Sequence, residues 1–171
     1  FADWSLDNVG GQVAVWRIYD GYTAPLLKVF LTPAVVDVTG QGTAVYDGTA
    51  QLAGVAYALR GGLSTGPVKG GLIGGTDAGT YAIGMDGLYS GQLGYDLIGG
   101  TVGSLTITPR PLIITADAIT RIYGEGNPAL TYAITEGSLV ANDALRGALS
   151  TSARGDSDVG RYAIGAGTLT A

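Results

Sequence analysis

The chain has 171 residues with a net charge of −5, and only 13% of them are charged although 46% are hydrophobic and 30 are glycine. It contains neither cysteine nor histidine, which excludes disulfides, zinc–thiolate sites and iron–sulfur clusters and removes the commonest general base. The nine Lys and Arg residues form no run, so we expect neither nucleic acid nor an anionic membrane surface as a partner. No window approaches the roughly 20 apolar residues of a membrane span, so we expect no membrane insertion.

The first element is a leader segment, residues 1–33, which contains both tryptophans. Its aromatic residues could form a platform for sugars. We favour the other interpretation, that they pack the leader against the next segment, since large aromatics dominate small cores. The chain lacks an initial methionine, and we therefore expect an excised piece of a longer polypeptide. The aromatic residues of the leader are Trp4, Trp16, Tyr19, Tyr22 and Phe30.

A first β module is predicted over residues 34–108. Its short β-branched and alternating runs, including "VVDV", "TYAIG" and "SLTIT", are separated by glycine-rich turns. Alternation places Leu105 and Ile107 on one face of a strand that Pro109 ends, because proline lacks the N–H that a sheet ladder needs. The prolines of "TPRP", residues 108–111, predict a stiff joint.

A second module, residues 109–171, repeats the first. The phrase "DAGTYAIG" at 77–84 returns as "DVGRYAIG" at 158–165, and residues 35–59 align with 112–135. Counterparts of residues 91–108, which include the "SLTIT" strand, are missing. The second module therefore lacks its last strand, which predicts an open sheet edge or a gap that another chain fills.

One stretch of the second module, residues 136–147, has a different pattern. In "EGSLVANDALRG", Leu139, Val140 and Leu145 have roughly helical spacing and Gly147 is a plausible end. This pattern predicts at most one short helix in a module that is otherwise built of strands.

The repeated phrase contains an Asp-x-Gly-x-Tyr pattern, which is also typical of the tyrosine corner of immunoglobulin-like sandwiches. This similarity leaves an Ig-like β-sandwich as the alternative fold. In either fold we expect a structural role, with Asp and Gly forming the turn and the tyrosine hydroxyl hydrogen-bonded. The residues of the two copies are Asp77, Gly79, Tyr81, Asp158, Gly160 and Tyr162.

The sharpest recognition motif is "RGDS", formed by Arg154, Gly155, Asp156 and Ser157. On an exposed loop, its guanidinium and carboxylate could bridge an acidic pocket and a bound metal on an integrin. Arg, Gly and Asp are also common turn residues, and an ordinary turn is the competing interpretation. We assign no catalytic, cofactor-binding or metal-binding residue, and the chain is not expected to be an enzyme.

These motifs resemble known modules. "AVYDGTA" with Tyr46, Asp47 and Gly48, followed by "DAGTYAIG", is similar to the YDG-type module of large bacterial surface adhesins. The second module resembles the related MBG module, including its "YGxxNP" turn at Tyr123, Gly124, Asn127 and Pro128. The leader resembles the segment that precedes such modules in filamentous-haemagglutinin-like proteins.

The resemblance implies a mostly-β chain of tandem β-grasp-like modules. It also implies a very long protein that is exported through the two-partner route and displayed on the outer membrane for attachment or biofilm formation. The tandem modules would then be a stalk or spacer, and the partner a component of a host-cell or matrix surface. The alternative is an extracellular filament in which neighbouring copies donate strands to one another.

Overall fold

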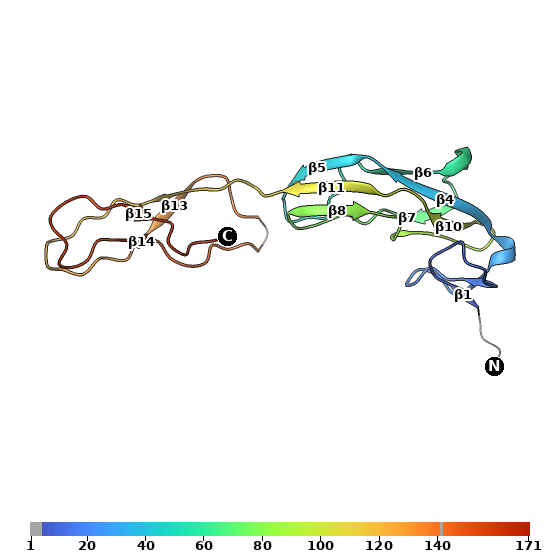
Figure 1. Cartoon of the computed structure of the whole chain (residues 1–171), viewed down its shortest axis with the longest axis horizontal. Coiled ribbons are helices and arrows are strands. Elements are labelled where there is room, and N and C mark those ends of the chain that lie inside the picture. The colour runs from blue at the N-terminus through green and yellow to red at the C-terminus, as the bar shows by residue number, and fades with distance from the viewer. Residues whose placement is uncertain (1–4, 141) are drawn as a thin grey trace. The chain divides into compact units, whose positions relative to one another are not determined.

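The computed structural model describes residues 5–140 and 142–171 and confirms a mostly-β chain of small sheets (Figure 1). The chain forms two compact units, unit 1 (Phe1–Pro109) and unit 2 (Arg110–Ala171). No helix in the described part of the chain is long and apolar enough to cross a membrane. The helical elements described are the single 3₁₀ turns η1 (Lys28–Phe30) and η2 (Arg60–Gly62).

Two three-stranded sheets form the centre of unit 1. In the first, β4 (Thr32–Thr39) pairs in parallel with β10 (Tyr95–Gly99) and antiparallel with β6 (Ala56–Leu59). The parallel pairing differs from the antiparallel sheets of an Ig-like sandwich. Three small strand pairs complete the unit: β1 (Leu6–Asp7), β2 (Trp16–Arg17) and β3 (Leu26–Leu27) form one sheet, and β7 (Val68–Gly70) pairs with β9 (Leu88–Ser90).

In the second sheet, β11 (Gly103–Thr108) is the central strand. It runs parallel to β5 (Gln41–Val45) and antiparallel to β8 (Gly79–Ile83). β5 follows β4 after Gly40, and β11 follows β10 after a break at Gly100. Backbone hydrogen bonds continue across this break, and the two parallel pairs therefore form one long ribbon.

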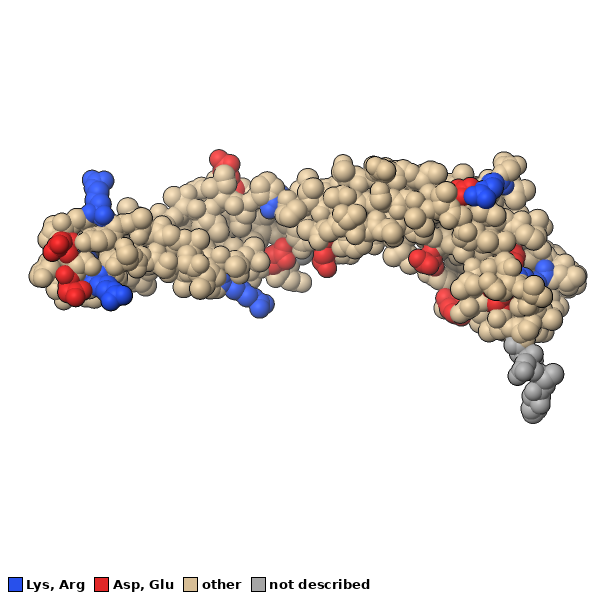
Figure 2. Space-filling view, viewed as in Figure 1, with Lys and Arg blue, Asp and Glu red and all other residues tan. Residues whose placement is uncertain are grey.

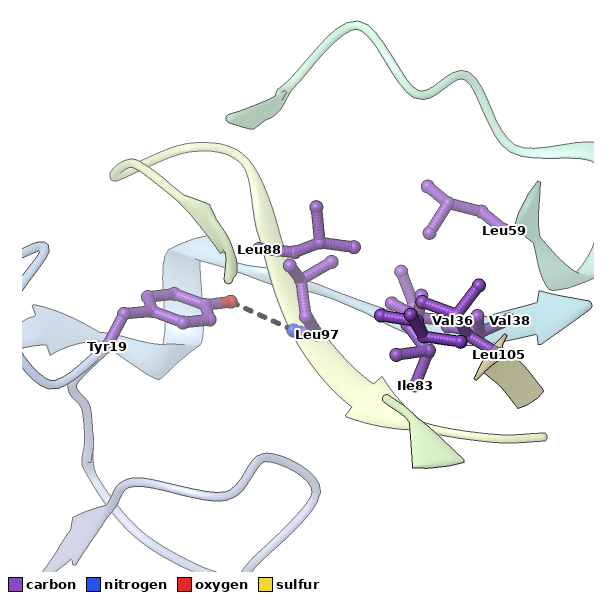
Figure 3. Packing of buried hydrophobic residues seen from close by; sticks show 10 residues of the cluster. Tyr19, Val36, Val38, Leu59, Ile83, Leu88, Leu97 and Leu105 are labelled. Carbon is purple, nitrogen blue, oxygen red and sulfur yellow. Dashed lines mark hydrogen bonds between the residues drawn. The ribbon is translucent and has the colours of Figure 1, made fainter. Parts of the chain in front are cut away.

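The hydrophobic core of unit 1 lies between these strands and follows their alternation (Figure 3). Every second residue of β4 from Ala34 to Val38 is buried, and Leu105 and Ile107 of β11 are 0% and 2% exposed. The core also receives Tyr19 from the leader, whose hydroxyl accepts a 2.9 Å hydrogen bond from the Leu97 N–H. The buried cluster comprises Tyr19, Ala34, Val36, Val38, Leu59, Ile83, Leu88, Leu97, Leu105 and Ile107.

A close backbone approach makes Gly42 of β5 hard to replace. A Cβ at Gly42 would lie 1.6 Å from the Ala53 carbonyl oxygen, so the backbone would have to move. We expect Gly42→Ala to lower the free energy of unfolding of unit 1 by about 1–3 kcal/mol, as overpacking does. Thermal melts measure the change. Gly99→Ala is the matched control, since nothing lies within 4 Å of its Cβ position, and an equal loss in both variants would contradict the prediction.

Unit 2 contains two strand pairs. β12 (Ile113–Ala116) pairs antiparallel with β13 (Tyr132–Glu136), and β14 (Ser150–Thr151) pairs antiparallel with β15 (Ile164–Gly165). The first pair begins as β4–β6 of unit 1 does, because Ile113 lies opposite Glu136 as Val36 lies opposite Leu59, each residue 77 positions later in the chain. From Ile114 onward an irregularity shifts the register by one residue. No described residue of unit 2 is buried, and the described part of this unit therefore lacks a closed core.

The short helix expected over residues 136–147 is absent from the described residues of that stretch, among which residue 141 is not included. Gly137 has a φ angle of 80°, which lies outside the right-handed helical region. Arg146 instead forms a bridge with Thr170, with backbone hydrogen bonds of 2.8 Å in both directions. The limit of at most one short helix therefore holds, but the weak helical spacing of this stretch does not produce a helix in the described residues, where long-range backbone bonds form instead.

Candidate functional site

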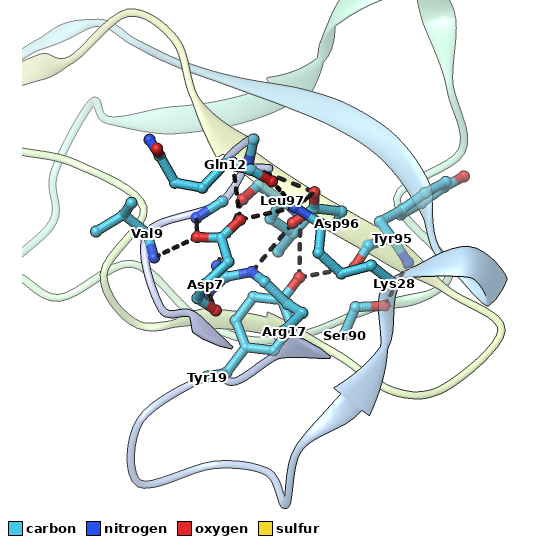
Figure 4. Close-up of polar contacts among 12 residues, drawn as sticks. Asp7, Val9, Gln12, Arg17, Tyr19, Lys28, Ser90, Tyr95, Asp96 and Leu97 are labelled. Atoms are coloured by element: carbon cyan, nitrogen blue, oxygen red, sulfur yellow. Dashed lines mark hydrogen bonds and ion pairs between the residues drawn. The ribbon is translucent and has the colours of Figure 1, made fainter. Parts of the chain in front are cut away.

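A buried cluster of charges joins the leader to the first sheet of unit 1 (Figure 4). The Lys28 ammonium contacts Asp7 at 2.8 Å and Asp96 at 2.9 Å. Arg17 Nε and Asp96 Oδ1 form an ion pair at 3.1 Å, without the alignment of a hydrogen bond. Asp7, Arg17 and Asp96 are 1%, 1% and 3% exposed, so the two positive and two negative charges compensate one another away from water.

The Arg17 guanidinium is also bound by backbone oxygens. It donates hydrogen bonds to the carbonyls of Asp7 at 3.1 Å and Ile18 at 2.6 Å. Its carbon lies 4.1 Å from the centre of the Tyr19 ring, a cation–π contact. The sequence analysis did not identify this cluster. The one available signal was an arginine between Trp16 and Ile18, in an apolar stretch of a chain with few charges.

Asp7 is held in its ionised form. Burial alone would raise its pKa, but hydrogen bonds from Lys28 and from the backbone N–H groups of Gly10, Gln12 and Val9 outweigh it and lower the pKa to about 2. Burial would likewise lower the pKa of Lys28, but its hydrogen bonds to Asp7 and Asp96 raise that pKa. The leader is therefore attached most firmly when both groups are charged.

We expect unit 1 to lose stability in acid through Asp7. The folded carboxyl binds its proton more weakly than the unfolded one, so about 2 kcal/mol of stability, present above pH 4, is lost as the pH falls towards 2. Urea unfolding at a series of pH values measures this slope. Asp7→Asn should flatten it more than Asp37→Asn, where the exposed pair with Arg60 also lowers the carboxyl pKa to about 2. Equal slopes in both variants would contradict the assignment.

The aromatic residues of the leader are divided between packing and exposure. Tyr19 is buried, and its hydroxyl donates a 2.7 Å hydrogen bond to the Tyr95 carbonyl of β10. Tyr22 stacks on Tyr89 of β9 with ring centres 4.8 Å apart. Trp16 is half-buried in β2 and Phe30 is exposed, whereas Trp4 lies outside the described residues. The described contacts of Tyr19 and Tyr22 are those of a leader packed on the sheet.

Both copies of the repeated phrase form the same tyrosine turn. The Tyr81 hydroxyl donates to the Asp77 carbonyl at 2.8 Å, and the Tyr162 hydroxyl donates to the Asp158 carbonyl at 2.9 Å. In unit 1 the ring covers Gly75, where a Cβ would lie 2.3 Å from a ring carbon. The turn begins before Gly79 in the first copy and before Gly160 in the second.

The YDG and YGxxNP turns lie at equivalent places in the two units. In unit 1, the Tyr46 N–H donates to the Thr108 carbonyl at 2.9 Å, the Asp47 carboxylate accepts bonds from Thr49, and Gly48 has a φ of 76°. In unit 2, Tyr123 is exposed, Gly124 has a φ of 89°, and the Asn127 amide donates to the Ala153 carbonyl at 2.6 Å. Pro128 lines the cavity described below.

The RGDS residues form a tight turn beside the YGxxNP turn. The Ser157 N–H donates to the Arg154 carbonyl at 3.0 Å, and the Arg154 N–H donates to the Ser157 hydroxyl at 2.8 Å. The Arg121 guanidinium donates hydrogen bonds to the carbonyls of Arg154 and Gly155. The side chains of Arg154 and Asp156 are exposed, and neither is bonded to another described residue. The turn is thus fixed through its backbone, with its charged side chains facing solvent.

Unit 2 also contains a groove, a cavity of about 560 Å³. One wall is formed by the segment that leads into the YGxxNP turn, and the other by the segment of the second tyrosine turn. We call it the unit 2 groove. The groove residues used below are Ile119, Thr120, Arg121, Gly160, Tyr162 and Ile164.

Comparison with known proteins places a family match on unit 2. No curated protein and no solved structure matches the chain significantly. Residues 112–171 match the sequence profile of the MBG domain (YGX type). MBG domains are found in surface adhesin-like proteins and are structural modules, which supports a structural or adhesive role and an extracellular or surface location. Unit 2 is thus similar to the YGX-type MBG domain over residues 112–171.

Proposed function

We propose that this chain is a spacer segment from the stalk of a large secreted bacterial adhesin. The observation that carries the proposal is the MBG match on unit 2, together with the repetition of its strand pair and tyrosine turn in unit 1. Unit 1 would be a YDG-type module of the same array. The parent protein would be exported by the two-partner route, remain at the outer membrane, and support attachment and biofilm formation.

The topology of unit 1 suits a spacer under tension. A load applied between Thr32 and Arg110 enters through β4 and leaves through the end of β11, the first and last strands of the long parallel ribbon. Pulling the N-terminal end of one parallel strand against the C-terminal end of its neighbour loads the ladder hydrogen bonds together rather than one after another. Charged side chains are few on the visible surface, where some lie beside a charge of opposite sign (Figure 2).

Single-molecule force spectroscopy tests the mechanical part of the proposal. The chain lacks cysteine, so cysteine handles at Thr32 and Arg110 define a pulling direction along the ribbon. Handles at Val45 and Arg110 are the control, because they pull β5 and β11 apart from the same end. We expect the first geometry to need the higher unfolding force. Equal forces in the two geometries would remove the mechanical argument for a spacer.

The biological part of the proposal needs the organism that produces the chain. Antibodies raised against the 171 residues should label intact cells. An in-frame deletion of these residues should reduce attachment or biofilm while the parent protein is still secreted. Lack of surface labelling would overturn the assigned location, whereas normal biofilm with a shortened protein would overturn the spacer role.

The exposed RGDS turn favours one more role, recognition by an integrin. Recognition by an integrin requires an accessible guanidinium and carboxylate on a fixed turn, and the exposed Arg154 and Asp156 side chains meet this requirement. Asp156→Glu should abolish attachment of integrin-bearing cells to surfaces coated with the chain. Asp158→Glu, which changes the neighbouring exposed carboxylate, should leave attachment unchanged. Unchanged attachment with Asp156→Glu would mean that RGDS is an ordinary turn.

A further inference from the structure

The unit 2 groove lies where unit 1 holds its central strand. In unit 1, β11 lies between β5 and β8 and contributes two fully buried side chains, Leu105 and Ile107. The segments of unit 2 that align with β5 and β8 are residues 118–122 and 160–164. Both border the groove. Among the described residues, 118–122 belong to no ladder, and of 160–164 only Ile164 is paired, opposite Thr151 of β14, which also lines the groove.

The β5 side of the groove is matched to unit 1 through the sequence alignment. Leu105 lies opposite Gly42, and Ile107 lies opposite Ala44. The residues 77 positions further along the chain are Ile119 and Arg121, and both line the groove. Ala118 and Thr120 also line the groove and residues 118–122 are not part of a sheet ladder, so the match to β5 rests on the sequence alignment.

The β8 side gives the same result independently. β8 contacts β11 through the pairs Ile83–Gly103, Tyr81–Leu105 and Gly79–Ile107. The residues 81 positions later are Ile164, Tyr162 and Gly160, and all three line the groove. The identical tyrosine turns fix this alignment, because Tyr81 and Tyr162 donate the same hydrogen bond.

The position of the groove also explains why the described part of unit 2 has no buried residue. The side chains that would face a central strand are only half-buried or exposed: Ile119 and Ile164 are half-buried, and Tyr162 is 40% exposed. In unit 1, Leu105 and Ile107 fill the equivalent space. Two apolar side chains, two residues apart on one strand, would give unit 2 a comparable core.

We propose that the unit 2 groove is an acceptor site for one extended peptide strand of the β11 type. The strand runs parallel to residues 118–122 and antiparallel to residues 160–164, with its first large apolar side chain between Ile119 and Tyr162. The peptide is uncharged. Its large apolar residues alternate with Thr or Ser, as in residues 104–108. Backbone hydrogen bonds provide affinity, and the alternate apolar side chains provide specificity.

The occupant is a strand that is free to dock, rather than β11 of a second copy. β11 is committed to its own unit, since it is bonded on both edges and its apolar side chains are buried. The leader is also held, by the buried cluster around Arg17. The proposal goes beyond the spacer function and does not depend on whether the chain supports attachment.

A binding experiment with the full chain tests the proposal. The probe is a capped, fluorescent peptide with the sequence of residues 103–109, "GSLTITP", measured by anisotropy. We expect binding below about 1 mM, weakened at least about tenfold by Ile164→Asp, which would place a carboxylate in the groove. Leu139→Asp, an exposed apolar residue outside the groove lining, is the matched control and should bind normally.

A second measurement fixes the register and remains informative if Ile164→Asp perturbs the unit. Thr106 of β11 lies opposite Thr43 of β5, whose counterpart in unit 2 is Thr120. A peptide with cysteine at the Thr106 position should form a disulfide with Thr120→Cys and not with Thr131→Cys, an exposed position outside the groove lining. The chain has no cysteine of its own to interfere.

Three results would overturn the proposal. The first is no peptide binding up to about 1 mM. The second is equal binding when the two apolar peptide positions are replaced by Asp, or equal crosslinking at Thr120 and Thr131. The third is light scattering that shows oligomers which the peptide disperses, because the occupant would then be a second copy of this chain, as in the filament alternative.

Discussion

Arg17→Met should destabilise unit 1 by about 3–5 kcal/mol. The substitution keeps the length of the side chain but removes its charge, which leaves Asp7 and Asp96 buried with Lys28 as their remaining cation. It also removes the hydrogen bonds to the carbonyls of Asp7 and Ile18, whose oxygens are then left without this donor. The cost is therefore that of an uncompensated buried charge together with unsatisfied backbone groups.

Urea unfolding, followed by circular dichroism and tryptophan fluorescence, measures this effect. Both tryptophans belong to the leader, so fluorescence reports on its release while circular dichroism reports on the sheets. We expect a lower midpoint with an unchanged slope. Arg60→Met is the matched control, because the Arg60–Asp37 pair is exposed to solvent and should contribute little. Similar midpoint shifts in both variants would mean that the buried cluster has no special role in stability.

Leu105→Ala should lower the free energy of unfolding of unit 1 by about 2–5 kcal/mol. Leu105 is fully buried in the central strand of the second sheet, between β5 and β8, and Gly42 brings the β5 backbone close to it. Truncating the Leu105 side chain removes the free energy gained by transferring its methyl groups from water to the core. It also leaves a cavity, which the strands cannot close readily because hydrogen bonds hold them to their neighbours.

The control for this substitution is Val102→Ala, which truncates an apolar side chain that is 65% exposed just before β11. Chemical denaturation should show little change for Val102→Ala and a large change for Leu105→Ala. If the two variants were equally stable, the β11 side chains would not be the source of the core. The argument that a similar strand would complete unit 2 would then fail as well.

Periodicity and repetition in the sequence predict the mostly-β class and the positions of several strands. The alternation in "SLTIT" places Leu105 and Ile107 on the buried face, and the β-branched run at 35–38 lies within β4. Local patterns are informative here because a half-buried strand alternates apolar and polar residues, and this alternation is visible in the sequence. The tyrosine hydroxyls of both repeated phrases are hydrogen-bonded, since the turn is local and needs only residues four apart.

Long-range pairing could not be predicted in the same way. The parallel partners β4–β10 and β5–β11 lie far apart in sequence, and alternation does not specify which strands are neighbours. The buried cluster was missed because Asp7, Arg17, Lys28 and Asp96 are ordinary charged residues until the fold brings them together. The helical spacing over 136–147 does not produce a helix in the described residues. Arg146 instead forms a bridge with Thr170, a partner far away in the sequence that a local pattern does not reveal.

The long parallel ribbon also determines the order in which unit 1 can fold. Gln41 lies opposite Ser104, and Thr32 lies opposite Tyr95, so neither central pair can form before nearly the whole unit is present. Parallel pairing between distant strands requires long loops to close, and this loss of chain entropy comes before the stabilising contacts form. Such topologies therefore fold slowly. A chain of this kind that crosses a membrane from its N-terminal end would form its first central sheet only after β10 had emerged and its second only after β11 had emerged.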